Sequence, residues 1–112
     1  MYDIEVRQGG AVTLVRLRGE FDLFALGELR ETFDAVASLP GRILANLAEV
    51  TFLDLLSVRE LAARSQLEGC RLAFQTPSPE AVASIEAARL GDWIRFHPDP
   101  DRNDPQIFSG VS

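Results

Sequence analysis

The stretch VTFLDLLSVREL, residues 50–61, decides the fold of this chain. It opens with an apolar run typical of a buried strand, and Asp54 then stands where a polar cap would begin a helix. From Val58 onward, apolar residues recur at helical spacing. Leu55 and Leu56 follow the aspartate directly, where a helix start usually carries polar side chains. The stretch therefore predicts a strand, a helix and two aliphatic side chains at the helix start that need their own explanation.

Two strands and a helix are predicted before this stretch. Residues 2–8 and 11–19 are apolar at partly alternating positions on either side of Gly9-Gly10, which predicts a β-hairpin. Asp22 is a candidate N-cap for a helix over residues 23–39, which a Pro-Gly pair ends. The apolar stripe of this helix consists of Leu26, Leu29, Phe33 and Val36.

More strands and a third helix are predicted on either side of the second helix. Residues 42–50 are apolar nearly throughout, so we expect a strand buried on both faces. A short strand is expected over residues 70–76, and Ser78-Pro79 starts the third helix with a hydroxyl cap and a proline. Residues 92–96 predict a last short strand. The proline- and aspartate-rich residues 98–112 predict a flexible tail.

The order of these elements predicts an α/β fold. Strands that alternate with helices form a sheet with parallel central pairs, against which the helices pack. The opening hairpin adds an antiparallel edge, so we expect a mixed sheet of about five strands. The 112 residues suit one domain, which we place at residues 1–97.

Composition excludes several classes of function. The net charge is -6, lysine is absent and the arginines are scattered, so nucleic acid and anionic membranes are poor partners. No apolar run reaches the roughly 18 to 20 residues that a membrane span needs. The first residues do not have the pattern of a signal peptide, and the single cysteine allows no internal disulfide. We therefore expect a cytoplasmic protein.

Catalysis has little support in the sequence. Cys70 and His97 form the one nucleophile-and-base pair of this type, but Cys70 is expected to open a buried strand and His97 lies among prolines. A single cysteine and a single histidine do not make a metal site, and no cofactor motif is present. A small α/β enzyme that uses Cys70 remains a distant alternative.

Two short motifs carry a resemblance to a known family. GEFD at residues 19–22 and VTFLD at residues 50–54, in this order and with these flanks, resemble the STAS domain family, which includes bacterial anti-sigma factor antagonists. The resemblance covers nearly all of residues 2–97. It implies that the chain binds an anti-sigma factor, often a serine kinase of the GHKL ATPase type, near the start of the second helix and so frees a sigma factor. In such proteins the kinase phosphorylates the second hydroxyl residue after the aspartate, and the complex dissociates.

This sequence departs from the family pattern at the phosphorylation site. Leu55 stands at the first serine position, Leu56 at the phosphoacceptor position and Ser57 at the usual glycine. Leucine accepts no phosphoryl group, so we predict that the phosphorylation switch is lost or altered. Ser57 has two interpretations. It forms a capping box with Glu60, which we favour, or it is a displaced phosphoacceptor.

The leucines also predict a protein-binding surface. Neighbouring residues on a helix point to different faces, so at least one of Leu55 and Leu56 is expected to be exposed. In the family arrangement Leu23 and Phe24 lie nearby, which predicts an apolar patch suited to protein contact. The resemblance places Asp22 and Asp54 beside this site as an acidic pair, and helix capping is compatible with that role.

The predicted partner is an anti-sigma factor or a related regulatory protein, and a homodimer through the leucines is a second use that the sequence leaves open. Within the same fold, the alternative is a STAS subunit of a transporter or of a multi-protein signalling complex.

Overall fold

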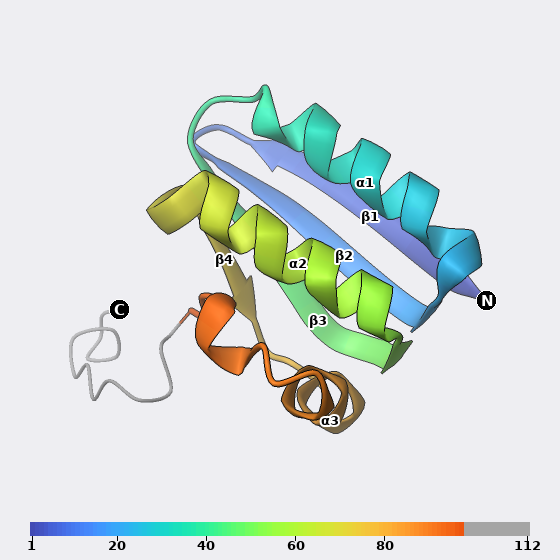
Figure 1. Cartoon of the computed structure of the whole chain (residues 1–112). Helices are drawn as coiled ribbons and strands as arrows, with labels where there is room; N and C mark the ends of the chain where they lie inside the picture. The colour runs from blue at the N-terminus through green and yellow to red at the C-terminus, as the bar shows by residue number, and fades with distance from the viewer. Residues whose placement is uncertain (98–112) are drawn as a thin grey trace.

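The computed structural model describes residues 1–97, in which one mixed sheet carries all the strands (Figure 1). The predicted tail, residues 98–112, lies outside the described residues. In sheet order, which is also chain order, the strands are β1 (Tyr2–Gly9), β2 (Val12–Phe21), β3 (Arg42–Leu53) and β4 (Leu72–Gln75). β1 is antiparallel to β2, whereas β2, β3 and β4 are parallel. The predicted α/β class and the opening hairpin are confirmed, with four strands in place of about five.

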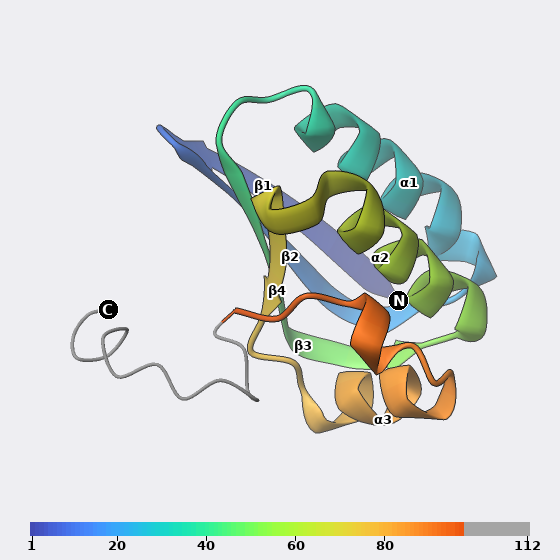
Figure 2. The same ribbon diagram turned by 60° about the vertical axis from the view of Figure 1, so that its left-hand side comes forward.

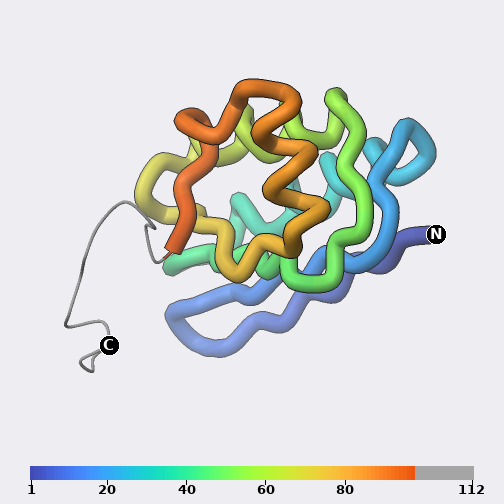
Figure 3. Tube along the Cα trace, turned by 90° about the horizontal axis from the view of Figure 1, so that it is seen from below, coloured from blue at the N-terminus to red at the C-terminus, as the bar shows by residue number. Residues whose placement is uncertain are grey.

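Of the three helices that residues 1–97 form, α1 (Leu23–Ala37) and α2 (Leu55–Glu68) connect the parallel strands, and α3 (Pro79–Ala87) follows β4. The 3-10 turns are η1 (Gly69–Arg71) and η2 (Gly91–Trp93). α1 and α2 lie side by side across one face of the sheet (Figures 1 and 2). α3 lies next to β3, as the view from below shows (Figure 3). Within residues 1–97, no helix combines the length and the apolar character that a membrane crossing requires.

β3 is buried on one face, which corrects the expectation that it would be buried on both. Ile43 and Ala45 are buried towards the helices, whereas the alternating residues Leu44 and Asn46 are half-buried on the opposite face. The reason is that right-handed crossovers place α1 and α2 on the same side of the sheet. The second face of β3 is left to polar and aliphatic side chains.

Gly19 of the GEFD motif allows β1 to pair with β2 as far as Tyr2, the first residue of β1. Its φ of +88° lies in the left-handed region, and a side chain there would collide with the carbonyl of Met1. The β2–β3 register shifts next to it, between Gly19 and Glu20, and the Glu20 amide donates to the Met1 carbonyl at 3.1 Å. A glycine is therefore required where β2 bends towards the start of α1.

The predicted fifth strand over residues 92–96 is wrong. The segment begins in η2, and only Phe96 forms a bridge, with Phe74 of β4. The backbone N–H groups of Ile94 and Arg95 are occupied elsewhere, by the Gly91 carbonyl and by the Ser65 hydroxyl. Arg95 and His97 are the residues whose backbone groups face β4, and the ladder does not continue because the Arg95 N–H donates to Ser65 instead.

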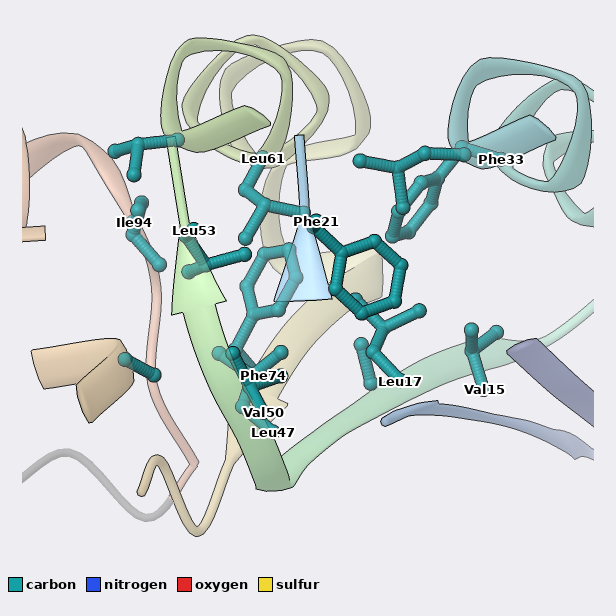
Figure 4. Packing of buried hydrophobic residues seen from close by; sticks show 14 of the residues in the cluster. Val15, Leu17, Phe21, Phe33, Leu47, Val50, Leu53, Leu61, Phe74 and Ile94 are labelled. Atoms are coloured by element: carbon teal, nitrogen blue, oxygen red, sulfur yellow. The ribbon is translucent and has the colours of Figure 1, made fainter. Parts of the chain in front are cut away.

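The core lies between the sheet and the pair α1 and α2 (Figure 4). Phe21, Phe33 and Phe74 are among its largest fully buried side chains, and the rings of Phe33 and Phe74 are 6.2 Å apart. The apolar stripe predicted for the first helix is confirmed, since all four of its residues are buried: Leu26, Leu29, Phe33 and Val36.

A partly buried ion cluster links α1 and α2. Arg64 contacts Asp34 and Glu60 at 2.7 Å each, and Glu60 also accepts from Arg30 at 3.1 Å. The side chains of Arg64 and Glu60 are only 13% and 12% exposed. Burial by itself lowers the pKa of Arg64, but the hydrogen bonds to Glu60 and Asp34 outweigh it, and the net pKa is raised. The cluster keeps the guanidinium charged and fixes the two helices relative to each other.

We expect Arg64→Ala to lower the free energy of unfolding by about 1–3 kcal/mol, because Glu60 would keep its burial and lose a charged partner. Urea denaturation followed by the fluorescence of the single tryptophan measures this change. Arg59→Ala, at an exposed position of the same helix, is the control and should shift stability by less than about 0.5 kcal/mol. Equal effects of the two substitutions would show that the cluster does not stabilise the helix pair.

Candidate functional site

Two copies of one local pattern lie next to each other at the carboxyl edge of the sheet. β2 ends at Phe21 and β3 ends at Leu53, and these two residues are partners in the parallel ladder. Each strand is followed by one aspartate and then by a helix with two large apolar residues at its start, FDLF at 21–24 and LDLL at 53–56. Because the strands are parallel neighbours, α1 and α2 begin at the same end of the molecule (Figure 1).

Both aspartates cap their helices, as predicted. Asp22 accepts a hydrogen bond from the Phe24 amide at 3.0 Å, and Asp54 accepts one from the Ser57 amide at 2.8 Å. The predicted capping box of Ser57 and Glu60 is wrong. α2 already begins at Leu55, so Ser57 lies inside its first turn, and the Glu60 carboxylate is held by arginines of α1 and α2.

The carbonyl of Phe21 joins the two helix starts. It accepts from the Asp54 amide at 3.0 Å and from the Ser57 hydroxyl at 3.2 Å. Ser57 is completely buried, and its hydroxyl points into the protein towards the end of β2. In this conformation a kinase has no access to that oxygen. The alternative of Ser57 as a displaced phosphoacceptor stays a prediction that requires the first turn of α2 to open.

The four apolar side chains at the helix starts are exposed. The exposed fractions are 66% for Leu23, 87% for Phe24, 48% for Leu55 and 42% for Leu56. The expectation that at least one of the two leucines is exposed is confirmed, and in fact both are. We call these four residues the entrance patch. Exposed aliphatic and aromatic side chains at adjacent helix starts are a surface suited to protein contact.

Acidic groups lie next to the entrance patch. Asp22 and Asp54 occupy the caps, and Glu20 contacts the N-terminal ammonium group of Met1 at 3.3 Å. Glu28, one helical turn after Phe24, accepts a hydrogen bond from the Tyr2 hydroxyl at 2.8 Å. The chemistry of this region, apolar side chains with carboxylates around them, favours a partner that presents apolar and basic groups.

The structure keeps Cys70 and His97 apart. Cys70 is exposed in η1, before β4, which corrects the expectation that it opens a buried strand. His97 lies beyond the other end of β4, where its amide donates to the Phe74 carbonyl at 2.7 Å. A cavity of about 710 Å³ between α2, α3 and the segment after η2 is lined by His97 and Trp93 but not by Cys70. Across residues 1–97, no three potential metal ligands come together.

Sequence reasoning found every residue of the entrance patch but missed the contact that orders it. The Phe21 carbonyl is a backbone group, so no side-chain pattern identifies it. The signal that was available is the repeated order of one apolar residue, one aspartate and two apolar residues after two predicted parallel strands.

Comparison with known proteins identifies the fold. The family model described as STAS domain matches residues 3–103. The crystal structure of an anti-sigma factor antagonist from Mycobacterium paratuberculosis superposes with a TM-score of 0.74 at 23% identity, over 90% of this chain and 89% of that one. The structure of the anti-sigma factor antagonist SpoIIAA in its unphosphorylated form superposes with a TM-score of 0.66 at 18% identity, over 98% of this chain and all of the other. Comparison with curated protein sequences finds no match.

Tyr2 offers a test of the contacts beside the site. Its hydrogen bond to Glu28 raises the pKa of the phenol, and desolvation and the negative charges of Glu28 and Asp22 act in the same direction. We therefore expect the native titration midpoint to lie above the ordinary value of about 10, where the denatured chain titrates. The raised pKa contributes stability that is complete below about pH 10 and is lost as the pH rises through the native pKa.

The absorbance of tyrosinate measures this midpoint directly, because the chain has one tyrosine. Glu28→Gln removes the charge but keeps an acceptor, so the native midpoint should move towards that of the denatured chain. A native midpoint equal to or below the denatured one would contradict the contact between β1 and α1.

Proposed function

The chain belongs to the STAS domain family, and we propose that it is a protein-binding regulator, an anti-sigma factor antagonist that docks through the entrance patch. By binding the anti-sigma factor it would release a sigma factor in the cytoplasm. The proposed docking residues are Asp22, Leu23, Phe24, Asp54, Leu55, Leu56 and Ser57. No cofactor or metal takes part in this function.

The observation that supports the proposal most strongly is the exposure of large apolar side chains at two adjacent helix starts. All four residues of the entrance patch are exposed to solvent. The residues that follow them directly in α1 and α2 are buried. Single exposed apolar residues are common on protein surfaces, but four large ones at two adjacent helix starts favour an interaction site. Because the two helix starts are fixed, they hold these side chains in one geometry. Binding then loses less conformational entropy.

We propose further that phosphorylation does not switch this protein. Leu56 stands at the position of the family phosphoacceptor and has no hydroxyl group. Ser57 has one, but this hydroxyl is buried and donates a hydrogen bond to the Phe21 carbonyl. A phosphate there would add about -1.5 to -2 charges next to Asp54, and the resulting repulsion and desolvation would displace the first turn of α2.

Binding of purified anti-sigma factors from the source organism, measured one at a time by isothermal titration calorimetry, tests the proposal. We expect one of them to bind, and Leu56→Glu to weaken that binding at least about 30-fold, as for a central contact residue. Leu67→Glu is the matched control, because Leu67 is 73% exposed near the far end of the same helix. It should change the dissociation constant less than about twofold.

Adding ATP to the complex tests the lost switch in the same experiment. Where the bound anti-sigma factor is a kinase, ATP should leave the affinity unchanged and mass spectrometry should find no phosphate on Ser57. Phosphate on Ser57 together with dissociation would contradict the loss of control. Equal effects of Leu56→Glu and Leu67→Glu would contradict the docking surface, and capture by a permease or a signalling assembly alone would favour the alternative STAS role.

A further inference from the structure

The outer edge of β1 is a long strand edge with which no other strand of residues 1–97 pairs. β1 lies at one end of the sheet and pairs with β2 over eight consecutive residues without a bulge. The strand contains neither proline nor lysine, two of the features that keep edge strands from pairing with other chains. The opposite edge of the sheet is different, because β4 has only four residues and the segment at Phe96 bridges to it.

Backbone geometry determines which groups of β1 face outward. The Glu20 amide donates to the Met1 carbonyl, and this pair continues the register in which Tyr2 lies opposite Gly19. In an antiparallel ladder, hydrogen-bonded and non-hydrogen-bonded pairs alternate. The odd-numbered residues of β1 therefore bond to β2. The even-numbered residues direct their N–H and C=O groups to the free edge: Tyr2, Ile4, Val6 and Gln8.

The side chains of β1 are complementary to themselves in the antiparallel direction. Asp3, Glu5 and Arg7 lie on the face of the sheet opposite α1 and α2, whereas Ile4 and Val6 lie on the helix side. When a second β1 runs antiparallel to the first and is centred on Glu5, Asp3 lies opposite Arg7 and Ile4 lies opposite Val6. Both contacts occur twice because the arrangement is symmetric.

We infer that this edge binds the same edge of a second copy of the chain, around a two-fold axis at Glu5, so that the two sheets form one continuous sheet. The four outward-facing residues of each copy then form four backbone pairs, with about eight hydrogen bonds. Val6, which is 45% exposed, becomes covered by Ile4 of the second copy. The inference concerns β1 and does not depend on the proposed docking function.

Charge and apolar pairing together favour the register centred on Glu5 over its two neighbours. A register centred on Ile4 would place Asp3 opposite Glu5 of the second copy, and like charges directly opposite are unfavourable. A register centred on Val6 would place Glu5 opposite Arg7, but it would put each Ile4 opposite the polar Gln8 and so lose both contacts between Ile4 and Val6. The register centred on Glu5 brings its two Glu5 side chains together, but each has Arg7 at 3.3 Å, Arg18 at 3.4 Å and Arg16 at 3.6 Å. These arginines offset the repulsion.

Sedimentation equilibrium over a range of protein concentrations tests the inference through a charge exchange. We expect the wild type to form a reversible dimer and Arg7→Glu to raise its dissociation constant at least about tenfold, because each Asp3 then faces a glutamate. The double variant Asp3→Arg with Arg7→Glu should restore the dissociation constant to within about threefold. Arg59→Glu makes the same change in net charge at an exposed site of α2 and should leave it unaltered.

Hydrogen exchange of the wild type gives a second readout that needs no substitution. The amides of Ile4 and Val6 should exchange fast in dilute solution and slowly at high concentration, whereas those of Asp3 and Glu5 are protected in both. A wild type that stays monomeric, a dimer with unprotected Ile4 and Val6 amides, or a double variant that fails to recover would each overturn the inference.

Discussion

The carbonyl of Phe21 is the contact on which the candidate site depends. It is the last backbone acceptor of β2, and it binds both the amide of Asp54 and the hydroxyl of Ser57. The side chain of Phe21 is fully buried in the core, so the carbonyl is held in place. One end of α2 is thereby fixed to the strand that leads into α1. Two helix starts that come from different parts of the sequence are thus held in one arrangement. The apolar residues at these starts remain exposed to solvent.

Most of the fold follows from sequence patterns that act locally. The hairpin needs only alternating residues and a glycine turn, and Asp22, Asp54 and Ser78 cap the helices where a side-chain oxygen precedes a helical pattern. Two of the errors share a cause, which is competition from groups that are distant in the sequence. Residues 92–96 read as a strand, but the hydroxyl of Ser65 takes a backbone donor that the ladder needs. Ser57 and Glu60 have capping-box spacing, but a carbonyl of β2 and arginines of both helices engage them instead.

The one-sided sheet separates two kinds of surface. α1 and α2 cover one face of the sheet and enclose the core. The entrance patch lies at the edge of this core, where β2 and β3 end. The second face carries Glu5, Arg16 and Arg18 in close ion pairs, together with exposed or half-buried aliphatic side chains such as Leu14 and Leu44. Exposed ion pairs of this kind add little stability. These ion pairs instead determine which charges lie along the edge of β1. The entrance patch is a separate, apolar surface for a different partner.

The central claim is that the starts of α1 and α2 act as one binding surface. A double-mutant cycle with Phe24→Ala and Leu56→Ala, measured as the affinity for the anti-sigma factor that binds the wild type, tests it most directly. The account predicts a coupling energy of at least about 0.5 kcal/mol, because residues that share one contact region are not independent. Two losses of affinity that add within about 0.3 kcal/mol, or no loss in either variant, would show that the two helix starts do not form one surface.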